Sequence, residues 1–590
     1  MKNFSTDVSK VSGEPLGNEL PGNELSGNKP SGERSPQPFT SKANFKRLFV
    51  LFLWFLFTLW ALRVSGTPEL NWGGCASIYQ FLSASFRPEL SPAFLWVMAK
   101  AALATFAFAV CGTTLSLVIG LIFGVACSRL WWRIFLPGTV GQGIWMVLRG
   151  GLAVPRAIHE LIWGLLLLNV LGLDPIVGVC AIAIPFGAIT AKVFSEIIDE
   201  TPAEPLNALV NSGVYPVTAF FYAQLPQALP NLISYGFYRF ECSLRAAAVL
   251  GIIGAGGLGE QIFLSWQSLQ YAEVWTGFYA LILLNGLVDT WSAKLRRQMG
   301  FVSRMDIARR TNAQKRRAAT ERNRFFIWGS WLAIALSIPL CFAYLDLGWA
   351  RIGRSPPFLI DLASQVTPDR VLSALSFSLV PLALQTVAMS VLAINLAGIG
   401  GVLFSFPAAQ NFFLPGGLLQ SVGTASRWGG GHLVLLLSRL ILLAARAIPA
   451  PILALIIVFG MYPGVWPGAL ALAIHNFGIL GRLMAEVNEN LPDRPLRALR
   501  SLGASGSGIV FYGILPANFA RFLAYILYRW EVCLRETVIV GLVGVGGLGR
   551  LMTEQLSSFD YSGLAATLLV FIGLTIIVDT ISAQMRSAVR

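Results

Sequence analysis

Long apolar runs separated by short polar stretches dominate the chain from residue 46 onward. A helix that crosses a bilayer needs about 20 mostly apolar residues, so each run predicts one membrane span. Six spans are predicted near residues 46–64, 100–127, 152–171, 174–198, 225–255 and 274–293. Six more are predicted near residues 325–345, 376–406, 440–460, 464–487, 515–545 and 563–583. The pattern therefore predicts an all-α membrane protein with about 12 transmembrane helices.

An internal repeat divides these spans into two halves of six. Four motifs of the first half recur in the second half, each at the same offset of 290 residues. They are Leu225-Pro226 with Leu515-Pro516, Tyr238-Arg239 with Tyr528-Arg529, the glycine-rich runs 251–259 and 541–549, and Val288-Asp289-Thr290 with Val578-Asp579-Thr580. Repeats that run in the same direction pack about a pseudo-twofold axis along the membrane normal, so we expect a pathway between the halves.

Composition and charge agree with a membrane location. Charged residues make up 13% of the chain and hydrophobic residues 55%, whereas a soluble protein carries about 25% charged residues. Much of the net charge of +14 lies in one stretch between two spans, Lys294 to Arg324. Such a stretch is typical of a loop that faces the cytoplasm and the lipid headgroups. It lacks the interleaved aromatic residues of a nucleic-acid-binding segment, and we expect no nucleic-acid partner.

The same charge bias sets the expected domain order and topology. An even number of spans in each half places both termini and the basic loop on the cytoplasmic side of a bacterial inner membrane. Residues 1–45 are polar and repetitive, which predicts a disordered cytoplasmic tail rather than a signal peptide. The expected segments are 46–99 (first span and external loop), 100–295 (first transmembrane domain), 296–324 (basic linker), 325–374 (seventh span and external loop) and 375–585 (second transmembrane domain).

Residue patterns that would indicate a metal, a cofactor or ATP binding are missing from the sequence. The seven cysteines show no CxxC spacing, and the three histidines are dispersed. The run Gly254 to Gly259 satisfies G-x-G-x-x-G, but it ends an apolar span and lacks the strand that a dinucleotide site requires. This glycine-rich run instead predicts a helix break near the outer face of the membrane. No phosphate-binding P-loop motif occurs, so we expect no cofactor, no ATP hydrolysis and no enzyme activity in this chain.

A short segment between the fourth and fifth spans of each half has matched spacing. The first half contains Asn207-Ala208-Leu209, then Gly213 and Leu225-Pro226, and the second contains Arg497-Ala498-Leu499, Gly503 and Leu515-Pro516. Glycine permits a turn and proline suits the first turn of a helix, which predicts a helix, a break and a second helix that leads into the next span. An ordinary connecting loop is the alternative, but the identical spacing favours a docking element for another subunit.

This spacing resembles the EAA loop of ABC-importer permeases, E-A-A-x3-G-x9-I-x-L-P, which in that family docks on the ATPase subunit. The first Glu is replaced by Asn207 and Arg497, and the Ile by Ala223 and Gly513. The segments around Leu225-Pro226, Tyr238 to Arg245 and the glycine-rich run resemble the phosphonate/phosphite/phosphate importer permeases. Ala447-Ile448-Pro449 and Ala153-Val154-Pro155 are matched to that family's Arg-Ala-Ile-Pro segment.

The resemblance covers roughly residues 100–295 and 375–585. It implies two fused type I ABC-importer (MetI-like) six-helix halves that act as the permease of an ATP-driven importer. It also implies a separate ATPase dimer, a periplasmic or extracellular substrate-binding protein, and a phosphorus oxyanion as cargo.

Charged residues inside the fifth and eleventh spans are the candidate pathway residues. Glu241 and Arg245 are four residues apart, as are Glu531 and Arg535, so each pair can form a salt bridge on one helical face. Such groups usually face the bundle interior or a cavity. They either fix helix packing or, with Arg245 and Arg535 facing each other, line the path of a small anionic substrate.

Two other functions agree with parts of the pattern. Fused permeases also serve thiamine or ferric-iron importers, although the Tyr-Arg-Phe-Glu segment at 238–241 argues against them. A twelve-helix secondary transporter driven by an ion gradient also has two parallel halves, but it would not need two docking elements of matched spacing.

Overall fold

The computed structural model describes residues 41–299, 314–348, 364–413, 430–541 and 543–589, and the single positions 353, 357 and 360. Within these residues the regular structure is helical, and the one strand-like pairing is an isolated β-bridge between Leu70 and Met461. The expected tail before residue 41 and the linker residues 300–313 lie outside the described residues. The helix after each of these two gaps begins earlier than expected. Helix α1 starts at Ser41 rather than near residue 46, and α15 starts at Gln314 rather than near residue 325.

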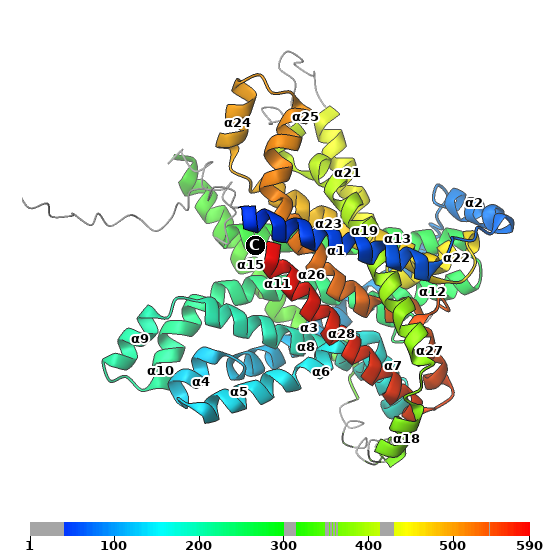
Figure 1. The fold of residues 1–590 in the computed structure, drawn as a ribbon, viewed down its shortest axis with the longest axis horizontal. Coiled ribbons are helices and arrows are strands. Elements are labelled where there is room, and N and C mark those ends of the chain that lie inside the picture. Colours follow the sequence, from blue (N-terminus) through cyan, green and yellow to red (C-terminus); the bar gives the residue numbers. More distant parts are fainter. Residues whose placement is uncertain are drawn as a thin grey trace, which may run out of the picture.

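The first half consists of a bundle of long helices joined by shorter ones (Figure 1). Its elements are α1 (Ser41–Ser65), η1 (Trp72–Gly74), α2 (Cys75–Ala84), α3 (Pro92–Ala126), α4 (Arg129–Phe135), α5 (Thr139–Gly151), α6 (Ala153–Ala157), α7 (Glu160–Leu171), α8 (Pro175–Glu200), α9 (Glu204–Asn211), α10 (Pro216–Ala219), η2 (Phe220–Gln224), α11 (Leu225–Gly251), α12 (Leu258–Gln267) and α13 (Tyr271–Gln298).

The second half repeats this order, and its central helices have similar lengths. Its elements are α15 (Gln314–Leu345), α18 (Pro368–Ala374), α19 (Leu379–Ala408), α20 (Gln410–Phe413), α21 (Gly430–Ala447), α22 (Ala450–Gly460), α23 (Val465–Glu489), α24 (Asp493–Ser501), α25 (Gly506–Ile509), η3 (Val510–Ile514), α26 (Leu515–Gly541), α27 (Gly547–Ser557) and α28 (Tyr561–Val589). The structure thus agrees with the repeat read from the sequence.

Small residues allow the central helices of each half to pack closely. An added Cβ at Gly120 of α3 would lie 2.4 Å from the Thr190 side chain of α8. In the second half, a Cβ at Gly401 of α19 would lie 3.1 Å from Leu480 of α23. Close backbone approach at small residues stabilises helix pairs in lipid, where no hydrophobic force drives association. The α3–α8 pair forms the core of the first half, and the α19–α23 pair forms the core of the second half.

The third span of each half is broken rather than straight. Nine described helices are long and apolar enough to cross a membrane, or ten when the bent pair Thr139–Ala157 and Glu160–Leu171 is taken as one span. That pair bends by 84° before His159, whose Nδ1 accepts from the Leu161 backbone at 3.3 Å. In the second half Pro449 precedes α22 in an extended conformation. The prediction of one unbroken helix over 152–171 and another over 440–460 was therefore wrong. The residues on both sides of each break are apolar, so hydropathy alone does not show where one helix ends and the next begins.

The first helix of each half packs on the opposite half. Trp54 of α1 donates from Nε1 to Asn395 of α19 at 2.8 Å, and its ring lies 5.0 Å from that of Trp530. Reciprocally, Cys341 and Leu345 of α15 join the hydrophobic core formed by α3 and α8. The two halves are therefore interlocked, although each keeps its own core.

The glycine-rich runs break the helices as the sequence predicts. Gly254, Gly256 and Gly257 have φ of +84°, +101° and +87°, a region that favours glycine. The break in each half is held by a threonine from a neighbouring helix: the backbone N–H of Leu258 donates to Thr105 at 2.8 Å and that of Leu548 donates to Thr386 at 2.9 Å. No strand accompanies either run within the described residues.

Replacing Thr386 by valine is expected to destabilise the protein. The change leaves the buried Leu548 N–H without an acceptor, which costs about 1–3 kcal/mol. The check is the thermal unfolding midpoint of the solubilised protein. Thr580→Val is the matched control, because the Thr580 hydroxyl is exposed and bonds only to its own helix at Ile576. Equal midpoints for the two variants would contradict this role of Thr386.

Candidate functional site

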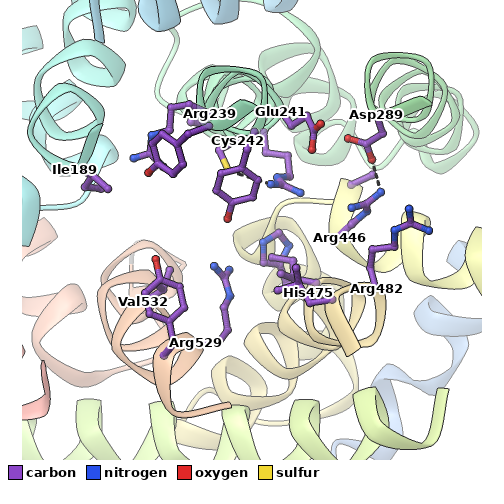
Figure 2. A pocket seen from close by; sticks show the side chains of 18 of the residues that line it. Ile189, Arg239, Glu241, Cys242, Asp289, Arg446, His475, Arg482, Arg529 and Val532 are labelled. Carbon is purple, nitrogen blue, oxygen red and sulfur yellow. Dashed lines mark hydrogen bonds and ion pairs between the residues drawn. The ribbon is translucent and has the colours of Figure 1, made fainter. Parts of the chain in front are cut away.

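A cavity of about 1240 Å³ lies between the two halves. Figure 2 shows α11 and α13 of the first half on one side, and α23 and α26 of the second half on the other. Among the described residues nine arginines and six carboxylates line it. They are Arg156, Arg239, Arg245, Arg296, Arg446, Arg482, Arg497, Arg529, Arg535, Glu160, Glu241, Asp289, Glu486, Glu489 and Glu536. A cation-rich cavity therefore lies between the halves; that it is the transport pathway stays a prediction.

A buried apolar cluster lies along the cavity. Val249 of α11 and Ile539 of α26, which are related by the repeat, form a cluster with Leu161 of α7. All three are at least 91% buried. The cavity extends to the exposed side chain of Arg497 on α24. The cavity therefore reaches the second docking element and this apolar cluster.

The eleventh span carries the ion pair that its spacing predicted. The Arg535 Nη2 lies 3.3 Å from Glu531 Oε1, and its Nη1 donates to the backbone oxygen of Arg156 at 3.0 Å. Six residues earlier, Arg529 donates to Asn476 and to Glu536, each at 2.5 Å. Arg529 and Arg535 of α26 are therefore each paired with a carboxylate.

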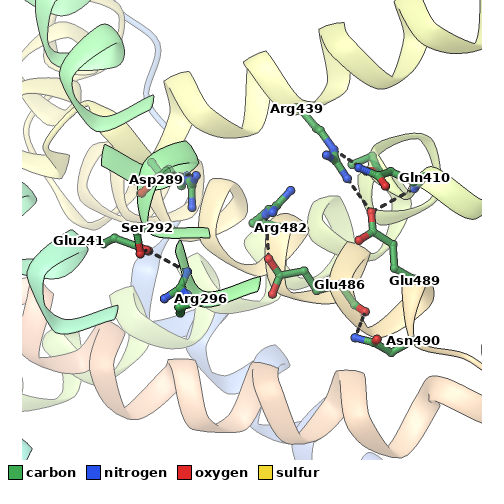
Figure 3. Close-up of polar contacts among 12 residues, drawn as sticks. Glu241, Asp289, Ser292, Arg296, Gln410, Arg439, Arg482, Glu486, Glu489 and Asn490 are labelled. Atoms are coloured by element: carbon green, nitrogen blue, oxygen red, sulfur yellow. Dashed lines mark hydrogen bonds and ion pairs between the residues drawn. The ribbon is translucent and has the colours of Figure 1, made fainter. Parts of the chain in front are cut away.

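The fifth span does not carry the corresponding pair, which corrects the expectation for Glu241 and Arg245. Glu241 instead accepts from Ser292 at 2.6 Å and from Arg296 at 3.0 Å, both on α13 (Figure 3). These donors reach the carboxylate from the neighbouring helix and occupy it. Arg245 is left with a weak contact to Cys242 Sγ at 3.3 Å. Arg245 and Arg535 nevertheless line the same cavity.

Two ion pairs connect the halves in a reciprocal manner. Arg446 of α21 pairs with Asp289 of α13, as Figure 2 shows, and Arg156 of α6 pairs with Asp579 of α28 at 3.8 Å. Both partners of the first pair are separated from those of the second by the repeat offset of 290 residues. Each half therefore supplies one arginine and one aspartate to the other.

Sequence reasoning missed these pairs because it matched the wrong residues. Arg446-Ala447-Ile448-Pro449 corresponds to Arg156-Ala157-Ile158-His159, since His159 and Pro449 precede α7 and α22 in the same extended conformation. The earlier match to Ala153-Val154-Pro155 was shifted. The common offset would have found Arg156, because it applies to this segment as well.

The docking elements have the expected helix–glycine–helix geometry. Asn207-Ala208-Leu209 lie on α9 and Arg497-Ala498-Leu499 on α24. Gly213 and Gly503 follow with φ of +86° and +85°. Leu225-Pro226 and Leu515-Pro516 begin α11 and α26, each after a π-helical turn.

The two elements project from the bundle at separate places, as Figure 1 shows for α9 with α10 and α24 with α25. Leu206 and Leu496 anchor them and are at least 98% buried. Asn207, Ala208, Arg497 and Ala498 are exposed, as are the repeat-related tyrosines Tyr222 and Tyr512, at 79% and 83%. Exposed aromatic residues on a projecting helix pair are typical of an interaction surface.

Polar contacts fix the end of α23, which directly precedes the second docking element. Glu489, at the end of α23, accepts from Arg439 at 2.5 Å and from the Gln410 backbone at 3.1 Å (Figure 3). Arg482 pairs with Glu486 at 2.9 Å one turn earlier. Among the described residues, no group of three or more His, Cys, Asp or Glu could hold a metal ion.

Comparison with known proteins places the chain in a family. The family model described as "Binding-protein-dependent transport system inner membrane component" matches residues 49–299 and 417–590. The phosphate-import permease protein PhnE of Mycolicibacterium smegmatis is 27% identical over 530 residues, which cover 90% of this chain and 92% of that protein. The phosphite transport system permease protein PtxC of Stutzerimonas stutzeri is 31% identical over 203 residues, 34% of this chain and 68% of that protein. No solved structure shows significant similarity to the chain.

The two matched segments fall in the two halves of the repeat, and the described helices include at least nine that could cross a membrane. The fold expected from the resemblance is thereby confirmed, and a secondary transporter is not favoured. The chain belongs to the family of binding-protein-dependent transport system inner membrane components, as a multi-pass permease of an ABC importer in which two units are fused.

Proposed function

We propose that this permease carries a phosphorus oxyanion, that is phosphate, phosphite or a phosphonate. The observation that supports the cargo most directly is the excess of arginines over carboxylates in the cavity between the halves. Guanidinium groups match the geometry of phosphorus oxyanions better than any other side chain. The full-length relative is named for phosphate import and the shorter one for phosphite transport.

The energy source in this proposal is a separate ATPase dimer that binds α9 and α24. The chain contains no P-loop motif, and the two projecting elements offer one docking surface to each ATPase subunit. Their contacts would differ, because Asn207 is neutral where Arg497 is charged. The side of the docking elements would then be the cytoplasm. Figure 1 places the C-terminus and the first described turn of α1 on that side too.

The transport cycle would be alternating access. The cavity extends to Arg497 of the second docking element, and Val249 and Ile539 line it where they pack with Leu161. In this proposal the apolar cluster is the seal toward the external side. This arrangement corresponds to a state that faces the cytoplasm. ATP binding would draw the two docking elements together and open the apolar seal toward an external binding protein that delivers the anion. The permease contributes only a difference in affinity between its states.

The test of the cargo is ATP hydrolysis by the reconstituted complex with its ATPase and binding protein. Phosphate, phosphite, a phosphonate and thiamine are each titrated through the binding protein. The proposal expects stimulation by at least one of the three phosphorus compounds and none by thiamine. Stimulation by thiamine alone, or by ferric iron in the same assay, would overturn it.

A further inference from the structure

The cavity has two walls that are related by the repeat: the first wall is formed by α8 and α11, and the second by α23 and α26. The walls differ in how many of their arginines are paired with carboxylates. On the second wall Arg529 is compensated by Glu536, which also accepts from Asn476 at 2.9 Å. Arg535 is compensated by Glu531 and also donates to the Arg156 backbone, although its Nε has no hydrogen-bond partner among the described residues. A guanidinium that already holds a carboxylate has its charge and most of its donors occupied, so this wall offers little to a passing anion.

The first wall lacks the compensating groups at the equivalent positions. Arg239 corresponds to Arg529, but Phe186 stands where Asn476 would be and Ala246 where Glu536 would be. Arg239 stacks on the Phe186 ring, with Cζ 3.8 Å from the ring centroid. Arg239 therefore has the same position in its helix as Arg529, but it lacks the amide and carboxylate partners that Arg529 has.

Arg239 is also buried and under-bonded. It is 94% buried, and its Nε and Nη2 have no hydrogen-bond partner among the described residues. A buried charge without a partner is costly, and within a membrane segment such groups are usually functional. Nε and Nη2 form the edge of the guanidinium that binds two oxygens of an oxyanion side by side. Both nitrogens are enclosed in this structure while Arg239 itself lines the cavity, so a bound anion would reach this edge when the side chain leaves the Phe186 ring.

Neighbouring groups extend this site along α11. Arg245 lies one and a half turns further and has only Cys242 Sγ as a described hydrogen-bond partner. Tyr235 and Tyr238 line the cavity on the same helix, and Tyr528 faces them from α26. Figure 2 shows Arg239 and Cys242 on α11, opposite Arg529 and Val532 on the second wall. Phenol hydroxyls can donate to the remaining oxygens of a tetrahedral anion.

We propose that the permease binds its anion asymmetrically, with Arg239 and Arg245 of the first half as the ligands, while Arg529 and Arg535 of the second half serve structure. This assignment rests on the proposed function and makes it more specific. A single cationic wall suits a transporter, because an anion held by two walls at once would leave slowly. The fused chain is what allows the two halves to differ in this way.

The experiment measures protection of Cys242, which lines the cavity between the two proposed ligands. The solubilised permease–ATPase complex is treated with a small thiol reagent at increasing concentrations of inorganic phosphite or phosphate, and modification of Cys242 is followed by peptide mass spectrometry. Arg239→Gln is expected to raise the half-protecting concentration about tenfold or more, since it removes charge-assisted hydrogen bonds. Ala246→Glu is expected to act similarly, because it gives Arg239 the partner that Arg529 has.

The matched control is the double variant Arg529→Gln/Glu536→Gln, which removes the equivalent charges of the second wall together. It should retain protection within about twofold of the parent chain. Arg239→Lys keeps the positive charge, so its half-protecting concentration should rise less than that of Arg239→Gln. This difference would show that the effect of Arg239→Gln comes from the lost charge rather than from misfolding.

The outcomes separate this inference from the proposed function. If the parent chain transports a phosphorus oxyanion but Arg239→Gln leaves protection unchanged, or the double variant impairs it equally, the asymmetric site is wrong and the cargo stands. If the reconstituted complex responds only to a phosphonate, protection is measured with that compound. If none of the three phosphorus compounds protects Cys242 or stimulates the complex, the proposed function itself is wrong.

Discussion

Replacing Asp289 by arginine is expected to reduce transport below about a tenth of its normal rate, and Arg446→Asp in the same chain to restore most of it. The partners are only 17% exposed, and breaking one buried pair costs about 3–5 kcal/mol. The single variant would place two arginines against each other at the contact between the halves. The double variant recreates the pair with its charges exchanged. Uptake and membrane insertion are measured together for both.

The repeat offers a matched control for this charge exchange. Asp579→Arg should be rescued by Arg156→Asp and not by Arg446→Asp, because the structure pairs Asp579 with Arg156. The effect of Asp579→Arg should be smaller, since this pair is longer and its side chains are 22% and 30% exposed. Rescue by the partner within the same half would contradict the reciprocal arrangement.

The second large effect is expected at the docking elements. Gly213→Pro and Gly503→Pro should each abolish the stimulation of ATP hydrolysis by the loaded binding protein while leaving membrane insertion intact. Proline fixes φ near −65° and has no N–H, whereas these glycines have φ near +85° and donate to Val210 and Arg500. Nothing lies within 4 Å of a Cβ at either position, so the damage should stay local.

Gly66→Pro is the control for a general effect of proline at a left-handed glycine. Gly66 has φ +65°, with open space around its Cβ, and follows the end of α1 that lies away from the docking elements. It should keep normal stimulation. Unchanged stimulation in both docking variants would remove these elements from the coupling mechanism, and equal loss in Gly66→Pro would make the effect nonspecific.

Much of the fold could be predicted from the sequence because the membrane constrains it. Apolar run length gives the spans, and the 290-residue offset gives the two halves. The helix–glycine–helix elements followed from local chemistry, since Gly213 and Gly503 permit a turn that other residues disfavour. These features depend on short segments, and the structure places them where the pattern predicted.

Features that depend on contacts between distant segments could not be predicted in the same way. The partner of Glu241 is Arg296 on another helix rather than the nearer Arg245. The crossing of α1 and α15 to the opposite halves leaves no trace in hydropathy. The isolated charge of Arg239 becomes visible only when the positions that surround it, Phe186 and Ala246, are known.

The central claim is that a duplicated helix bundle moves an anion only when a separate ATPase drives its two docking elements. The most direct measurement is uptake of radiolabelled phosphate or phosphite into proteoliposomes that contain the chain, with the loaded binding protein outside and ATP inside. We expect uptake when the ATPase dimer is present and none when it is omitted, with or without a proton or sodium gradient. Gradient-driven uptake by the chain alone would contradict the account.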